Sequence, residues 1–142
     1  MSIPIAISGT DLIGQARTGT GKTLAFGVSA LQRIVLPGDE GWTQSGSRLP
    51  QALVMCPTRE LALQVSRDID TAARVRGARV LTVYGGVGYD SQIDALKRGV
   101  DVVVGTPGRL LDLVGRRDLN LTSCSIVVLD EADEMLDLGF LP

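Results

Sequence analysis

One short stretch near the start of the chain decides the fold: Ala16-Arg17-Thr18-Gly19-Thr20-Gly21-Lys22-Thr23. It follows an apolar run, residues 11–15 (DLIGQ), and leads into a segment of helical character, residues 22–36. Small residues at such a junction let successive backbone N–H groups turn toward one anion, with a helix N-terminus behind them. Lys22 would reach the β- and γ-phosphates of a nucleotide, and the Thr23 hydroxyl would bind Mg²⁺. The strict pattern begins with Gly where this chain has Ala16, and the weaker alternative is a glycine-rich turn that only precedes a helix.

Working outward, apolar runs alternate with helical segments along the chain. The runs predict strands at residues 11–15, 52–56, 79–84, 101–105 and 125–130, and the segments between them predict helices at 22–36, 58–75, 89–98 and 107–115. Three runs are almost wholly apolar without alternation, which is typical of parallel strands buried on both faces. The sequence therefore predicts an α/β fold with three layers, α-β-α, and a mainly parallel sheet. Residues 37–50 lack periodicity and predict a surface loop, in which Trp42 either packs against its own loop or stacks on a base.

Composition narrows the class of protein. The chain has 142 residues, 44% of them hydrophobic and 21% charged, which fits one globular domain. It has no histidine, which excludes a Ser-His-Asp triad and every zinc site that needs His, and its two cysteines indicate a reduced, cytoplasmic protein. The formal net charge is −2, so no overall basic field attracts nucleic acid. No apolar stretch approaches the ~20 residues that cross a bilayer, so no membrane partner is expected.

A second candidate site follows the last apolar run. That run delivers Asp130 to the carboxyl edge of the predicted sheet, where open α/β folds bind their ligands. There Asp130 would hold Mg²⁺ through its waters, opposite Thr23, and Glu131 would orient and deprotonate the attacking water. By itself the pair would equally suit a solvated acidic turn before a helix. The phosphate-binding loop upstream favours the catalytic interpretation.

These motifs and three others, in the same order along the chain, resemble those of the DEAD-box RNA helicases. Residues 130–133 spell the family's Asp-Glu-Ala-Asp signature, and residues 15–23 resemble its phosphate loop. Three further motifs resemble the family's RNA-contacting segments: residues 57–62 (PTRELA), Gly85-Gly86 and residues 106–109 (TPGR). Apart from residues 37–50, the resemblance covers essentially the whole chain. It implies the first of two P-loop, RecA-like helicase domains, with ATP and Mg²⁺ on one edge and single-stranded RNA across the motif loops.

The resemblance also implies a role for each matched residue. Residues 16–23 would bind ATP, Lys22, Asp130 and Glu131 would be catalytic, and Asp133 would couple the two domains. The residues implied to bind RNA are Pro57, Thr58, Arg59, Gly85, Gly86, Thr106, Pro107, Gly108 and Arg109.

The chemistry of these residues fits a sugar–phosphate backbone. The motif threonines and glycines offer hydroxyl or backbone N–H donors, and Arg59 and Arg109 add local charge without a basic surface. Such contacts predict binding independent of base sequence. Each motif alone would be interpreted as a helix cap or tight turn, and Arg59 as a structural ion-pair partner. Their shared order along the chain favours RNA binding.

We therefore expect an ATP-dependent RNA helicase that separates short duplexes locally. A non-catalytic nucleotide- or RNA-binding module is the alternative, and a P-loop kinase or transporter ATPase leaves residues 57–62 and 106–109 unexplained. The family's adenine-reading Gln motif has no match here, so ATP rests on the resemblance. Residues 1–142 are expected to form an incomplete ATP-binding domain, with the second helicase domain and the Ser-Ala-Thr motif outside them.

The resemblance makes one further structural prediction. It places the strand that ends in the Ser-Ala-Thr motif between the phosphate-loop strand and the Asp130 strand. Without that strand, two rows of backbone N–H and C=O groups would lack partners, at about 1 to 3 kcal/mol for each buried group. Residues 1–142 alone are then expected to be marginally stable or to associate, to bind nucleotide weakly, and to show no RNA-stimulated ATPase activity.

Overall fold

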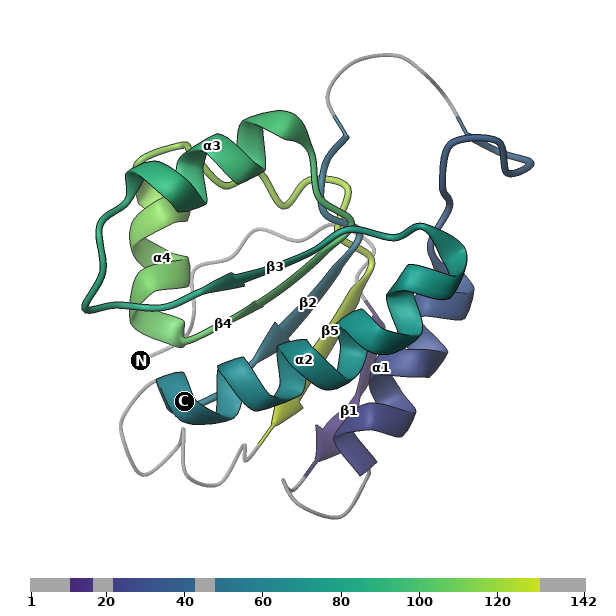
Figure 1. Ribbon diagram of the computed structural model, residues 1–142, viewed down its shortest axis with the longest axis horizontal. Coiled ribbons are helices and arrows are strands. Elements are labelled where there is room, and N and C mark those ends of the chain that lie inside the picture. Colours follow the sequence, from purple (N-terminus) through teal and green to yellow (C-terminus); the bar gives the residue numbers. More distant parts are fainter. Residues whose placement is uncertain (1–10, 17–21, 43–47, 131–142) are drawn as a thin grey trace.

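The computed structural model describes residues 11–16, 22–42 and 48–130, with the backbone alone for residues 11–26 within these ranges. Strands and helices alternate along the described chain (Figure 1). Their bounds are β1 (Asp11–Ala16), α1 (Lys22–Arg33), β2 (Ala52–Met55), α2 (Arg59–Arg76), β3 (Val80–Val83), α3 (Asp90–Arg98), β4 (Val102–Gly105), α4 (Pro107–Gly115) and β5 (Ile126–Asp130). The predicted alternation is confirmed, and the ends differ by at most three residues.

The five strands form one parallel sheet in the order β1-β5-β2-β4-β3. The three strands β5, β2 and β4 therefore lie inside the sheet, with neighbours on both sides. Helices α1 and α2 cover one face, and α3 and α4 cover the other (Figure 1). The predicted three-layer α-β-α architecture with a parallel sheet is confirmed.

Alternation along the strands assigns their side chains to the two faces. Ala52 and Val54 pack with α1 and α2, whereas Leu53 and Met55 pack with α4 on the opposite face. All four side chains are buried, because both faces of β2 are covered by helices. An interior parallel strand thus needs an unbroken apolar run, which is why the sequence shows no polar alternation there.

The prediction of an unpaired gap between the phosphate-loop strand and the Asp130 strand is wrong for this chain. β1 pairs directly with β5, with Ala16 opposite Asp130 and a register irregularity between Leu12 and Gly14. The backbone groups that would have lacked partners bond to each other across this contact. Direct pairing removes the structural reason for expecting residues 1–142 to be unstable or to associate.

A loop is predicted at residues 37–50, of which 43–47 lie outside the described residues. Its described parts lie at the amino edge of the sheet, because they follow the end of α1 and precede the start of β2. Asp39 stabilises its first turn by accepting hydrogen bonds from the Leu36 N–H and from Arg76. Trp42 is half-buried, and its indole N–H has no hydrogen-bond partner among the residues that the structure describes. The RNA-type motifs follow strand ends at the opposite edge, so topology places Trp42 away from them and does not favour base stacking with RNA bound there.

A buried ion pair between Arg48 and Asp101 links chain segments at the amino edge of the sheet. Asp101, fully buried before β4, accepts hydrogen bonds from Arg48 Nε at 2.8 Å and Arg48 Nη2 at 2.6 Å. The same carboxylate accepts a third bond from the Arg79 backbone N–H at 2.8 Å. This carboxylate raises the pKa of the Arg48 guanidinium above its ordinary value through hydrogen bonding, which outweighs partial burial. The pair joins the chain before β2 to the starts of β3 and β4, opposite the predicted functional edge.

Candidate functional site

The predicted motifs described by the structure follow the carboxyl ends of the strands, at one edge of the sheet. Strands β5, β2, β4 and β3 are parallel and pair in continuous register. Neighbouring partners near their carboxyl ends therefore lie level across the sheet: Leu129 with Met55, Met55 with Gly105, and Gly105 with Val83. Two backbone hydrogen bonds then join the segments beyond them. The Cys56 N–H donates to Gly105 O at 2.9 Å, and the Thr106 N–H donates to Val83 O at 3.1 Å. Strand pairing thus brings together motifs that are distant in sequence.

Strand order divides this edge into two halves. The phosphate-loop strand β1 and the Asp130 strand β5 are neighbours on one side. The strands that lead to the three RNA-type motifs, β2, β4 and β3, are neighbours on the other. The arrangement provides two adjacent candidate sites, a nucleotide half and an RNA half, that meet between β5 and β2.

Asp130 is the described residue at the centre of the nucleotide half. Its side chain is fully buried at the end of β5, and Ala16, the last residue before the glycine-rich loop, is its register partner. The Cys56 thiol donates toward Asp130 Oδ2 over 3.8 Å. Burial, with a smaller contribution from the Asp130 carboxylate, raises the pKa of the Cys56 thiol well above its ordinary range. Cys56 is therefore a neutral donor beside this carboxylate, a contact that sequence analysis missed.

The Asp130 side fits the way proteins hold Mg²⁺. This cation prefers oxygen ligands and commonly takes one or two carboxylates together with substrate phosphates and waters. Asp130 supplies such a carboxylate beside the strand that leads into the glycine-rich loop, and α1 begins at Lys22, directly after that loop. Within the described ranges, no three His, Cys, Asp or Glu side chains cluster as an all-protein metal cage would require. The surroundings of Asp130 therefore suit a cation shared with a bound phosphate.

Several predicted nucleotide residues lie wholly or partly outside the described structure. Lys22 and Thr23 are described by their backbone, which forms the first turn of α1. The residues outside the described ranges are Arg17, Thr18, Gly19, Thr20, Gly21, Glu131 and Asp133. Their assigned roles stay predictions.

Thr58 and Thr106 precede helices α2 and α4 in the RNA half. Thr58 caps α2, its Oγ1 accepting the Leu61 N–H at 3.3 Å. The Thr106 hydroxyl makes no such cap bond, and the buried Pro107 occupies the first turn of α4. The first N–H groups of a helix have no partner within it, so the exposed Gly108 presents an N–H donor there. Both helix starts therefore suit the anionic sugar–phosphate backbone of RNA. Of the two threonine hydroxyls, only that of Thr106 makes no cap bond to its own helix.

Arg59 joins two of the motif segments. Its guanidinium lies over the Tyr84 ring, 4.8 Å from the ring centroid, while the residue stays exposed. Among the described residues no carboxylate pairs with Arg59, so the alternative of a structural ion pair finds no support there. The stacked and exposed guanidinium keeps N–H donors for a phosphate.

The Gly85-Gly86 pair forms an exposed turn after β3. Gly86 has φ +84°, in the left-handed region that favours glycine, and a side chain there would meet no other atom within 4 Å. Gly85 and Gly86 are both exposed. Backbone strain, rather than space, thus explains the need for glycine at position 86.

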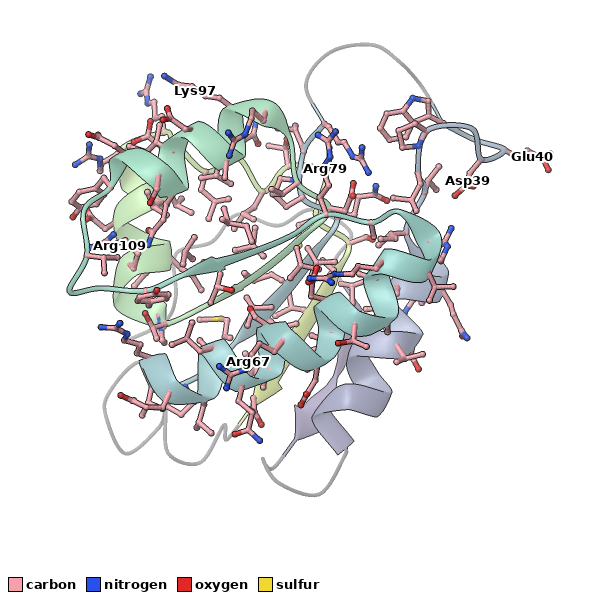
Figure 2. The ribbon with its side chains drawn as sticks, viewed as in Figure 1. Asp39, Glu40, Arg67, Arg79, Lys97 and Arg109 are labelled. Atoms are coloured by element: carbon pink, nitrogen blue, oxygen red, sulfur yellow. The ribbon has the colours of Figure 1, made fainter. Side chains whose placement is uncertain are left out.

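Arg109 differs from the expected exposed RNA ligand. It is 9% exposed and lies between α4 and the loop from β3 to α3 (Figure 2). Its guanidinium donates to Gln92 Oε1 at 3.0 Å and to Val87 O at 2.9 Å, and it stacks over Tyr89 at 4.1 Å. Direct contact between Arg109 and RNA stays a prediction, while the structure shows Arg109 holding its own loop. The motifs gave no indication of Gln92. The available signal was a polar residue at helical spacing from the apolar Tyr89 and Leu96.

The comparisons with known proteins agree with this geometry. The family model described as DEAD/DEAH box helicase matches residues 1–142. The chain belongs to this family. The resemblance drawn from its motifs is thereby confirmed, and its fold is that of a RecA-like helicase domain.

Two bacterial helicases of this family have sequences similar to this chain. The chain is 49% identical over 140 residues to the DEAD-box ATP-dependent RNA helicase CshA of Streptococcus pneumoniae serotype 4, covering 99% of this chain and 25% of that protein. It is 46% identical over 142 residues to the ATP-dependent RNA helicase RhlB of Yersinia pestis, covering 99% of this chain and 32% of that protein. The chain thus spans about a quarter to a third of these relatives' length.

Solved structures of the family share the fold. The yeast DEAD-box splicing factor Prp28 matches with a TM-score of 0.74 and 33% identity over 92% of this chain and 30% of that one. A DEAD box protein from the hyperthermophile Methanococcus jannaschii matches with a TM-score of 0.74 and 38% identity, over 92% of this chain and 33% of that one.

In the described part of this DEAD/DEAH box chain, no helix combines the length and apolarity needed to span a bilayer.

Proposed function

We propose that residues 1–142 form the first of two RecA-like domains of an ATP-dependent RNA helicase that separates short duplexes locally. The observation that carries this proposal is the division of one sheet edge into a nucleotide half at β1 and β5 and an RNA half at β2, β4 and β3. Family membership and relatives named as ATP-dependent RNA helicases support it. The two buried cysteine thiols agree with a cytoplasmic location.

In the nucleotide half, the backbone N–H groups of residues 16–23 would surround the phosphates of ATP. Lys22 would neutralise the β- and γ-phosphates, and Thr23 and Asp130 would hold Mg²⁺, which supplies charge stabilisation for phosphoryl transfer. Glu131, the residue after Asp130, would orient the attacking water and accept its proton. The burial of Asp130 keeps its carboxylate fixed in orientation at the strand end.

In the RNA half, the donors would contact phosphates and sugars. The Thr106 hydroxyl, the Gly108 N–H and the exposed guanidinium of Arg59 lie at the ends of neighbouring strands. These groups read no base edges, so binding would be independent of sequence. An acidic chain, with net charge −2, would then bind RNA through local donors and not through an overall basic field.

Turnover would need a second helicase domain that closes on the first. ATP and RNA would draw the two domains together, bend one strand of the duplex, and release it after hydrolysis. Asp133 would couple nucleotide state to this closure. A non-catalytic nucleotide- or RNA-binding module is the second candidate, favoured only if residues 1–142 act without a second domain.

RNA-stimulated phosphate release from ATP by the complete protein tests the proposal. Stimulation by unrelated RNA sequences to the same extent is the expected result. A protein that binds ATP and RNA but releases no phosphate would instead be the binding module. Lys22→Ala should weaken the binding of a fluorescent ATP analogue, because the loop loses its cation while its N–H groups remain; unchanged affinity would refute the role of Lys22.

A further inference from the structure

Two backbone carbonyls mark the ends of the exposed glycine turn after β3. One is Tyr84 O, which accepts a hydrogen bond from Gln92 Nε2 at 3.2 Å. The other is Val87 O, which accepts a hydrogen bond from Arg109 Nη2 at 2.9 Å. The turn between them, Gly85-Gly86, is exposed and carries the left-handed Gly86. Side chains from two different helices therefore hold the two ends of one turn.

The two holding side chains also bond to each other. Arg109 Nη1 donates to Gln92 Oε1 at 3.0 Å, so an unbroken chain of hydrogen bonds runs from Tyr84 O through both side chains to Val87 O. Gln92 is 4% exposed and Arg109 is 9% exposed. In such a buried setting both functions of the Gln92 amide are used, one as acceptor and one as donor.

Aromatic stacking fixes the guanidinium from another side. Tyr89 lies against Arg109 at 4.1 Å, and its hydroxyl donates to Asp112 on α4. Arg116 stacks on the same ring at 4.1 Å. The loop from β3 to α3 is thereby tied to both the first and the last turns of α4.

We propose that Gln92 and Arg109 form a positioning pair, the Gln92–Arg109 brace, which holds the Gly85-Gly86 turn and the start of α4 as one preformed surface for an RNA backbone. Arg109 would then act on RNA through the turn and not as a phosphate ligand. The inference rests on the proposed function and deepens it, because it separates the groups that touch RNA from those that position them. Preorganising the turn lowers the conformational entropy lost on binding.

The first test measures the turn without any RNA. Backbone NMR order parameters of residues 85–88 would be compared in the complete protein and in Gln92→Met, which keeps similar volume but breaks both hydrogen bonds. We expect these order parameters to fall from about 0.85, typical of a rigid backbone, to below about 0.6 in the variant, with core strands β2 and β4 unchanged. Gln92→Glu, which retains an acceptor for Arg109 but loses the donor to Tyr84 O, should lie between the two. The exposed Gln64→Met on α2 is the matched control and should match the wild type.

The second test measures RNA affinity at several salt concentrations. Gln92→Met should weaken the binding of single-stranded RNA about tenfold while leaving ATP affinity and the salt dependence unchanged, because no phosphate contact is lost. Arg109→Lys, which keeps the charge but cannot bridge Gln92 and Val87, should weaken binding equally, and the double variant should be no worse than either. A direct phosphate ligand would behave differently, since Lys would largely preserve affinity.

Unchanged order parameters of residues 85–88 in Gln92→Met would overturn the brace, as would lower order parameters throughout the protein, which would indicate general destabilisation. Full RNA affinity in Arg109→Lys would also overturn the brace, and would indicate instead that Arg109 contacts an RNA phosphate directly. If the wild-type protein binds no RNA, the proposed function fails, while the order parameters still decide whether the brace orders the turn.

Discussion

The Cys56 thiol and the Asp130 carboxylate face each other over 3.8 Å, both fully buried, although 74 residues separate them. Cys56 follows β2 and Asp130 ends β5, so the pairing of these two strands creates the contact. The thiol is thus a donor toward the carboxylate that we propose to hold Mg²⁺, and we expect it to help orient that carboxylate.

Cys56→Ala should therefore raise the Mg²⁺ concentration that gives half-maximal ATPase activity. Loss of an outer hydrogen bond to a metal ligand commonly weakens metal binding about tenfold or more, and a thiol donor should lie at the low end of that range. Titration of ATPase activity with Mg²⁺ measures the change. Cys124→Ala is the matched control, because that thiol is also buried but donates to the Ile126 carbonyl. Equal Mg²⁺ requirements for Cys56→Ala and the wild type would contradict the positioning role of Cys56.

Glu131→Gln should leave ATP binding nearly intact and lower turnover by about 10²-fold or more, since a general base contributes 10² to 10⁴. Because the ATP-bound state would persist, RNA should also dissociate more slowly in the presence of ATP. Single-turnover hydrolysis and RNA dissociation in the complete protein measure the two effects. Hydrolysis at the wild-type rate would assign water activation to another residue.

Gly105→Ala should destabilise the fold by about 1 to 3 kcal/mol, the usual range for overpacking a core. A Cβ there would lie 2.5 Å from Val83 Cγ2 and 2.9 Å from both Leu110 Cγ and Val83 O. Gly108→Ala, three residues later, would meet no atom within 4 Å and should not lower stability. Urea unfolding measures the stability of both variants. Equal stability of the two would show that β3 and α4 shift enough to accommodate the added Cβ.

Arg48→Met should cost about 3 to 5 kcal/mol, because it leaves the fully buried Asp101 carboxylate without its ionic partner. The exposed pair of Arg74 and Asp70 on α2 provides the control. Arg74→Met should change stability by at most about 0.5 kcal/mol. Chemical unfolding measures both, and similar costs at the two sites would contradict the importance of burial.

Stability should fall at alkaline pH through the buried thiols. Burial raises the pKa of Cys124 above its ordinary value near 9.0, against a smaller opposing effect of hydrogen bonding to the Ile126 backbone. Above the ordinary value the unfolded chain loses this proton while the folded chain keeps it, so the free energy of unfolding decreases as pH rises. The contribution of the Cys124 thiol to the free energy of unfolding is fully present below the ordinary thiol pKa. Above that pKa it is lost, and the free energy of unfolding falls by up to about 1.4 kcal/mol per pH unit. Unfolding at pH 7 and pH 10 should show a smaller loss in Cys124→Ala than in the wild type; identical losses would exclude the thiol as a cause.

The sequence by itself determined the elements of this protein and the class of its candidate site. Residues 52–55 and 102–105 could be recognised as buried strands because an interior parallel strand must be apolar on both faces. The motif at residues 16–23 predicts a phosphate-binding loop because phosphate binding needs small residues, a cation and a helix start in immediate succession; of these, the structure shows the helix start at Lys22. Both signals are local, so a reading along the chain finds them.

Only the tertiary structure decided which distant residues meet. The direct pairing of β1 with β5, contrary to the expected gap, depends on strand order, which apolar runs do not encode. The burial of Arg109 depends on the packing of α3 against α4, which places Gln92 within hydrogen-bonding distance of a residue that the motif alone marks as an RNA ligand. The physical reason is the same in both cases: spacing along the chain fixes periodicity and local conformation, whereas contacts between elements are selected by the burial and hydrogen bonding of the whole domain.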